Sequence, residues 1–142
     1  MRIHLNLLFI FVAGLSPQLV SAQEPATHPI EKALEACIDK NGSTAGMVRC
    51  EDEAYKMWDK ELNKKYLALT AKLPPRARAS LKASQLEWLK YRDLEFKLID
   101  SIYETFQGTM YIPMHLDRKK SVIKSRAEEL AHYLGMMSEG EP

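Results

Sequence analysis

The sequence predicts an all-α protein, an antiparallel helical bundle of one short and three longer helices with one disulfide. Three long segments carry apolar residues at steps of three and four, the spacing of one face of an α-helix. No segment shows the alternation of apolar and polar residues that is typical of a half-buried strand. Breaks containing glycine or proline separate the segments at residues 41–43, 74–75 and 107–109.

Residues 1–22 predict a cleaved secretory signal peptide. Arg2 precedes an apolar run at residues 5–15, and residues 20–22 supply the small side chains that signal peptidase prefers. A membrane anchor is disfavoured because the run is shorter than the ~20 residues of a spanning helix. Gln23 follows the cleavage point, so no lipid attachment is expected there. We therefore expect a periplasmic protein with no stable membrane anchor after cleavage.

The rest of the chain has the length of one small domain. We expect a flexible leader at residues 23–29, a helical domain at residues 30–135 and a tail at residues 136–142. The whole chain has 20 Lys+Arg and 19 Asp+Glu, and cleavage removes one arginine, so the mature chain has no formal net charge. This balance disfavours nucleic acid and polybasic membrane contacts, which need a basic face.

The first helix is predicted at residues 30–40. Asn41-Gly42 is typical of a helix end, and Ser43 or Thr44 can cap the next helix. Cys37 and Cys50 are the only cysteines, and an isolated pair in an exported protein predicts a disulfide. A loop of about fourteen residues closed in this way would stabilise the fold by ~3 kcal/mol. A metal or redox pair is disfavoured because the gap fits neither C-x-x-C nor zinc spacing.

The longest uninterrupted pattern runs from Thr44 to Leu73. At a rise of about 1.5 Å per residue, this helix is a rod of ~45 Å that cannot bury its apolar stripe alone. The other helices are therefore expected to pack along it. The stripe consists of Met47, Cys50, Ala54, Trp58, Leu62, Tyr66, Leu69 and Leu73.

A third helix is predicted to begin at Pro75 or Arg76 and to continue to Phe106. The tight Pro74-Pro75 turn predicts an antiparallel hairpin of the second and third helices. The expected stripe is Leu81, Gln85, Trp88, Arg92, Phe96, Ile99 and Tyr103, widened by Leu89, Leu94 and Leu98. Trp58, Leu62, Trp88 and Leu89 are expected to share one core.

Polar residues on these stripes must find partners when they are buried. Counting outwards from the turn brings Asp59 level with residues near 90 and Asn63 level with residues near 86. An Asp59–Arg92 ion pair is therefore predicted, and a contact from Asn63 to Gln85 or Trp88 is sterically possible. We favour a structural role for these residues in fixing the hairpin register over a ligand site.

The break at residues 107–109 precedes a short extended segment at residues 110–113, because Ile112 comes before a proline. The last helix is predicted at residues 114–134 and is expected to end at Gly135. Its stripe consists of Leu116, Ile123, Ala127, Leu130 and Leu134.

The sequence contains no recognisable catalytic or cofactor motif, so neither an enzymatic activity nor a cofactor is expected. His28, His115 and His132 lack metal-binding spacing, and no phosphate-binding loop or nucleophile elbow occurs. Glu51, Asp52 and Glu53 are consecutive and point in different directions on a helix, which favours a helix-dipole role. A soft copper site is disfavoured because methionine commonly fills core gaps. Its ligands would be Met110, Met114, Met136 and Met137 with His115.

Several spaced motifs together resemble one family. The first half contains Thr44-x-x-Met47-x-x-Cys50 and Trp58-Asp59-x-x-Leu62-Asn63-x-x-Tyr66. The third helix contains Ser84-Gln85-x-x-Trp88-Leu89-x-Tyr91-Arg92-Asp93, and Gly108-Thr109 and Arg126-x-x-x-Leu130 follow. Over roughly residues 30–134, this pattern is similar to that of the LprI-type lysozyme-inhibitor proteins. Its core, called here the motif residues, is Trp58, Asp59, Leu62, Asn63, Tyr66, Gln85, Trp88 and Arg92.

The resemblance implies a small exported helical protein of a bacterial family in which some members inhibit lysozyme. Lysozyme cleaves peptidoglycan with two carboxyl groups in a cleft, which an inhibitor must cover or plug with a basic or hydroxyl side chain. The sequence does not choose among the exposed turns. The candidate contacts on them are Asn41, Ser43, Arg76, Arg78, Thr109 and Tyr111. The alternative function is a non-catalytic envelope module that binds another protein, such as an immunity or assembly factor.

Overall fold

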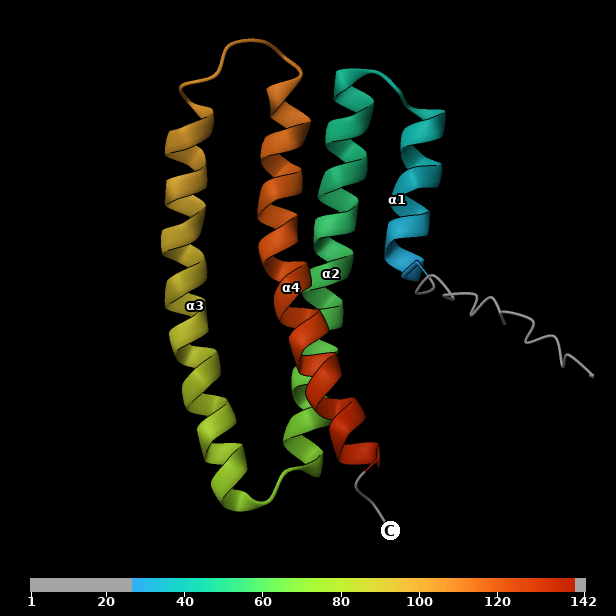
Figure 1. Cartoon of the computed structure of the whole chain (residues 1–142). Helices are drawn as coiled ribbons and strands as arrows, with labels where there is room; N and C mark the ends of the chain where they lie inside the picture. The colour runs from blue at the N-terminus through green and yellow to red at the C-terminus, as the bar shows by residue number, and fades with distance from the viewer. Residues whose placement is uncertain (1–26, 140–142) are drawn as a thin grey trace, which may run out of the picture.

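A computed structural model describes residues 27–139, which form four α-helices with short connections (Figure 1). The helices are α1 (Pro29–Lys40), α2 (Thr44–Lys72), α3 (Pro75–Tyr103) and α4 (Tyr111–Glu139). Successive helices run in opposite directions, and no strand occurs within these residues. The predicted fold class, one short and three long antiparallel helices, is confirmed. The predicted signal peptide lies outside the described residues.

Helix α4 packs along α2 for most of its length and also contacts α3, while α1 covers the first half of α2 (Figure 1). The main core consists of Trp58, Leu62, Leu69, Leu81, Ile123, Ala127 and Leu130. The expectation that the other helices pack along α2 is confirmed for α1 and α4. The shared α2–α3 core is only partly as predicted, because Trp88 is half-buried against the main core and Leu89 is not among the residues packed there.

The predicted Cys37–Cys50 disulfide is present and ties α1 to the second turn of α2. Cys50 is buried in a small core with Leu34 and Ala54. Beside it, Gly46 faces the carbonyl oxygen of Asn41 so closely that a Cβ atom would collide with it. The α1–α2 turn is therefore fixed both covalently and sterically.

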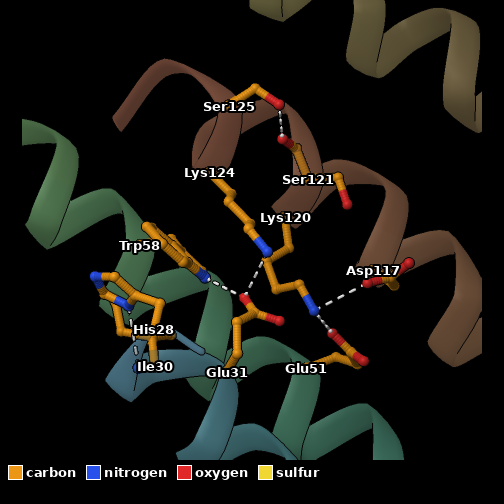
Figure 2. A network of polar contacts seen from close by, with 10 residues as sticks. All are labelled: His28, Ile30, Glu31, Glu51, Trp58, Asp117, Lys120, Ser121, Lys124 and Ser125. Carbon is orange, nitrogen blue, oxygen red and sulfur yellow. Dashed lines mark hydrogen bonds and ion pairs between the residues drawn. The ribbon is translucent and has the colours of Figure 1, made fainter. Parts of the chain in front are cut away.

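A buried ion pair joins α2 to α4 (Figure 2). Lys120 Nζ is 2.8 Å from Glu51 Oε2 and 2.9 Å from Asp117 Oδ1, and only 3% of Lys120 is exposed. Burial opposes a charged amine, but hydrogen bonds to the two carboxylates prevail and raise the pKa of Lys120. Burial also raises the pKa of Glu51, and the hydrogen bond from Lys120 offsets this effect only in part. This pair ties the first half of α2 to α4.

A second polar cluster joins α1 to the same two helices (Figure 2). Glu31 accepts a hydrogen bond from Trp58 Nε1 at 2.8 Å and lies 3.3 Å from Lys124 Nζ. The His28 ring packs on the Trp58 ring with 4.4 Å between centroids, and its Nδ1 accepts a hydrogen bond from Ile30 N. The described end of the predicted leader is therefore ordered, with His28 as the N-cap of α1 and Pro29 as its first residue.

Both predicted ends of the last helix were wrong. Helix α4 begins at Tyr111, so residues 111–113 are helical, because Pro113 lies in the first turn, where a missing N–H costs no hydrogen bond. Gly135 does not end the helix, because α4 continues to Glu139 and Met137 packs against the main core. The predicted tail is therefore helical over residues 136–139. Helix α3 ends at Tyr103, which places Phe106 in the following connection.

The outward face of α3 also differs from the prediction. Leu94 and Leu98 were expected to widen the buried stripe, but they are 66% and 53% exposed. Because α3 contacts little besides α4, only one side of the helix is covered. Tyr91 and Ile102 are exposed on the same side of the helix.

Removal of the disulfide should lower stability without unfolding the bundle. Cys37→Ser together with Cys50→Ser should cost about 3 kcal/mol of unfolding free energy, because the unfolded chain regains the freedom of the closed loop. Thermal and urea unfolding followed by circular dichroism measure the loss. Thiol titration of the denatured, unreduced wild-type protein should find no free thiol, and two thiols would contradict the bond.

Loss of Lys120 should be more severe than loss of the half-exposed Lys124. Lys120→Met leaves the buried Glu51 carboxylate without its cation, at a cost of about 3–5 kcal/mol. Urea denaturation measures the difference, with Lys124→Met as the control. Adding Glu51→Leu to Lys120→Met should recover most of the loss, and a single-variant cost below that of Lys124→Met would contradict this assignment.

Candidate functional site

An open groove lies between α2 and α3, and we call it the α2–α3 groove. Its volume is about 480 Å³. Every motif residue except Trp58 lines this groove, so residues that are spaced along the sequence motif come together on one surface of the molecule. The lining consists of Asp59, Leu62, Asn63 and Tyr66 from α2 and Lys82, Gln85, Leu86, Trp88, Leu89 and Arg92 from α3.

The α2 wall of the groove is built from residues at helical spacing. Leu62 is buried and forms the floor of the groove. Asp59 and Asn63 lie one helical turn apart on the same wall. Asn63 Nδ2 donates hydrogen bonds to the Asp59 carbonyl oxygen at 2.8 Å and to Asp59 Oδ2 at 3.3 Å. Asn63 thus forms its side-chain hydrogen bonds within its own helix and forms none with Gln85 or Trp88.

The α3 wall also forms its polar contacts away from α2. Arg92 donates from Nε and Nη2 to Asp93 Oδ1 at 2.9 and 2.7 Å, and its guanidinium lies 5.8 Å from the Trp88 ring centroid. The predicted Asp59–Arg92 ion pair was therefore wrong. The count of residues from the turn assumed that the two helices touch along their length, whereas the groove separates them.

Gln85 and Trp88 are instead held by Arg126 of α4. The Arg126 guanidinium donates to Gln85 Oε1 at 3.1 Å and to Ser84 Oγ at 3.2 Å, and it lies 5.9 Å from the Trp88 ring centroid. Arg126 is only 6% exposed and also pairs with Glu129. The Ser84-Gln85-x-x-Trp88 motif therefore forms the docking site for this arginine and fixes α3 to α4.

Lys120 and Arg126 are buried anchors that were not predicted from the sequence. The signal that could have found them is their position, because Lys120 follows Leu116 by four residues and Arg126 precedes Leu130 by four. Both therefore lie on the apolar stripe of the last helix. Trp58, the remaining motif residue, is also structural, because it is 1% exposed and bonded to Glu31.

The six candidate contact residues are divided between the two ends of the bundle (Figure 1). Asn41 and Ser43 lie at the end that also holds the α3–α4 connection. Both build the local turn: Asn41 Nδ2 donates to the Cys37 carbonyl at 3.0 Å, and Ser43 Oγ caps α2 by accepting from Gly46 N at 3.1 Å. Their polar groups are thus used within the fold.

The α3–α4 connection carries Thr109 and Tyr111 beside a hollow of about 250 Å³. Thr109 is exposed, and the Tyr111 ring packs on Phe106 with 4.9 Å between centroids. Asp100 and Glu104 supply carboxylates to the wall of the hollow. A hydrogen bond from Lys119, with a further one from His115, lowers the pKa of Asp100, so this carboxylate stays ionised in an ion pair with Lys119.

Arg76 and Arg78 lie at the opposite end, in the first turn of α3 beside the α2–α3 connection, and we call this end the basic end. Arg78 Nη2 donates to the Leu73 carbonyl at 3.0 Å, and Arg76 is exposed. Glu61 is the only acidic residue between Lys60 and Leu86, and it pairs with Lys65 and Lys64. The basic residues of this stretch are Lys60, Lys64, Lys65, Lys72, Arg76, Arg78 and Lys82.

The methionines considered for a copper site do not converge with His115. Met110 and Met114 line a hollow between α1, α2 and α4, whereas Met136 and Met137 lie at the basic end. His115 Nε2 contacts Asp100 Oδ1 at 2.6 Å on another side of α4. Within residues 27–139, no three His, Cys, Asp or Glu side chains gather as metal ligands would. The helices of that part of the chain are also too polar to span a bilayer.

Comparisons with known proteins match this chain to a protein family and to solved structures. The family model described as "Lysozyme inhibitor LprI" matches residues 37–130, which contain the disulfide, the α2–α3 groove and Arg126. Among solved structures, an uncharacterized protein from Burkholderia thailandensis matches with a TM-score of 0.75 and 33% sequence identity. The match covers 82% of this chain and 59% of that one, so this chain spans little more than half of its neighbour. No curated protein matches the chain.

The separation of Asp59 from Arg92 predicts that the two residues contribute independently to stability. Asp59→Asn and Arg92→Gln should change the unfolding free energy additively to within ~0.5 kcal/mol, as residues without a direct contact do. Urea denaturation of the two single variants and the double variant measures the coupling. Gln85→Ala with Arg126→Met is the matched control, because this pair is in contact and should show coupling above that limit. Equal coupling in the two cycles would contradict the geometry.

Proposed function

The chain belongs to the LprI lysozyme-inhibitor family, and from this premise we propose that the mature protein binds lysozyme and blocks its cleft. Family membership is the observation that carries the proposal. The signal-like residues 1–22 and the disulfide support export to the periplasm. There the protein would meet a lysozyme that reaches the cell wall. The chain acts by binding and not by catalysis.

The basic end is the surface that best fits a lysozyme cleft. The cleft presents two carboxyl groups that flank the scissile bond, and one of them must stay ionised for catalysis. A guanidinium pairs with a carboxylate through two parallel hydrogen bonds, which makes arginine well suited to the blocking role. Arg76 and Arg78 are exposed at a narrow end of the bundle, so they can enter a concave site.

The backbone of the turn is already rigid before binding. Pro74 and Pro75 fix two backbone angles, and the hydrogen bond from Arg78 to the Leu73 carbonyl closes the turn. Preorganisation reduces the entropy lost on association and so increases affinity. Lys82, which lines the α2–α3 groove, extends the positive surface along α3 from this turn.

The opposite end suits an acidic cleft less well. The polar groups of Asn41 and Ser43 are used in the α1–α2 turn, and the carboxylate of Glu104 lines the hollow beside Thr109. Like charges brought together on binding are unfavourable. Of the six candidate contacts, we therefore assign Arg76 and Arg78 to lysozyme.

The test is inhibition of cell-wall hydrolysis by the purified mature protein. Inhibition should saturate at one inhibitor per lysozyme. Arg76→Glu with Arg78→Glu should weaken it at least about tenfold, because a hydrogen bond to a charged group contributes about 1.5–3 kcal/mol. Raising the salt concentration should also weaken inhibition by the wild-type protein, because salt screens the attraction between charges.

The matched control makes the same change of charge at the other end of the bundle. Lys40→Glu with Lys97→Glu alters two exposed lysines and should leave inhibition within about twofold, since screened charges at that distance contribute little. Equal loss in both double variants would rule out the basic end as the contact. Absence of inhibition at large excess over several lysozyme classes would favour the envelope-module alternative.

A further inference from the structure

A second hollow, lined mainly by apolar side chains, opens where the ends of α2, α3 and α4 meet, and we call it the terminal pocket. It has a volume of about 340 Å³, at the small end of the range for ligand sites. Its lining consists of Leu69 and Leu73 from α2, Ser80, Leu81 and Ser84 from α3, and Arg126, Tyr133, Met136 and Met137 from α4.

The pocket has an apolar base and an adaptable mouth. Leu69 and Leu81 are buried, whereas Met136 is 56% exposed and Tyr133 is 41% exposed. Methionine side chains are flexible and polarisable, so they adapt to an apolar ligand of variable shape. The buried Arg126 guanidinium is already engaged by Ser84, Gln85 and Glu129, so no unpaired charge opposes an apolar ligand here.

Positive charges lie next to residues of the pocket lining. Arg78 Nη2 donates to the carbonyl oxygen of Leu73, a lining residue, at 3.0 Å. Lys72 Nζ donates to Ser138 Oγ at 3.3 Å, beside Met137. Arg76 is exposed on the same turn, and none of these three cations has an ion-pair partner among the side chains of residues 27–138. An apolar cavity is thus combined with neighbouring cations.

We propose that the terminal pocket binds a fatty acid, with its acyl chain in the hollow and its carboxylate between Lys72 and Arg78. Apolar walls favour the chain because burial removes its methylenes from water. The cations favour an anionic head group, and arginine can bind a carboxylate through two hydrogen bonds. A single chain suits the small volume better than a two-chain lipid. This binding activity is separate from lysozyme inhibition, and it is measured on the protein alone.

Methionine methyl resonances offer a direct test on the mature protein. Decanoate, titrated below its micelle concentration, should bind saturably at one molecule per chain and shift the methyl signals of Met136 and Met137. The signals of Met47, Met110 and Met114 should not move, because these residues lie at the other end of the bundle. Decanoate should bind about 16-fold more tightly than octanoate, since each buried methylene contributes about a fourfold gain in affinity.

Two tryptophan variants then locate the site. Ser80→Trp places an indole in the pocket wall and should weaken decanoate binding at least tenfold. Ser101→Trp is the matched control on the same helix, because both serines are exposed and each donates to the carbonyl four residues earlier. Ser101→Trp should bind decanoate as the wild-type protein does, and circular dichroism confirms that both variants remain folded.

Charge variants separate the head-group contact from the apolar contact. Lys72→Gln with Arg78→Gln should weaken decanoate binding about tenfold and leave decanol binding unchanged, and inorganic phosphate alone should not shift the methionine signals. The proposal is overturned by non-saturable binding, by equal shifts at Met110 and Met114, by unchanged binding in Ser80→Trp, or by equal loss of decanoate and decanol binding in the charge variant.

Discussion

The packing of α4 against α2 is the contact on which the rest of the structure depends, and the buried Lys120–Glu51 ion pair ties the two helices together. An apolar seam of Trp58, Leu62, Ile123 and Leu130 tolerates small shifts between helices, whereas a buried charge is costly unless it meets its partner. The second polar cluster, with Glu31 between Trp58 and Lys124, then fixes α1 onto the same pair. The disulfide reinforces that arrangement at the α1–α2 turn.

The open surfaces of the molecule follow from this choice of partners. Because α4 is the main partner of α2, α3 is held chiefly through α4, with Arg126 as the polar clamp on Ser84, Gln85 and Trp88. Helix α3 therefore does not close against α2, and the α2–α3 groove and the terminal pocket lie along its inner side. The outer side of α3 remains uncovered, which accounts for the exposed Leu94 and Leu98.

The two ends of the bundle differ in charge and in local construction, although the formal net charge of the whole chain is only +1. Asn41 and Ser43 serve the α1–α2 turn at one end, and the carboxylate of Glu104 lines the hollow at the α3–α4 connection of the same end. The other end gathers cations with Glu61 as their single acidic neighbour in the sequence. The same basic turn underlies both proposals, because a lysozyme cleft and a fatty acid each present a carboxylate. Inhibition assays and ligand titrations distinguish the two activities.

The sequence by itself determined the features that depend on local or covalent physics. Helical periodicity marked all four helices, the cysteine pair indicated the disulfide, Pro74-Pro75 set the antiparallel turn, and the spaced motifs identified the family. Helix ends were less certain, because the packing of Met137 on the core outweighs the helix-breaking tendency of Gly135. Only the tertiary structure decided which helix packs against which. An apolar stripe fits any other apolar stripe, so periodicity did not reveal that Gln85 meets Arg126 and not Asn63, or that Asp59 faces an open groove. Those choices depend on the shape and charge of surfaces that are distant in the sequence. The buried charges of Lys120 and Arg126 must lie beside their partners, and this requirement favours one arrangement of the helices.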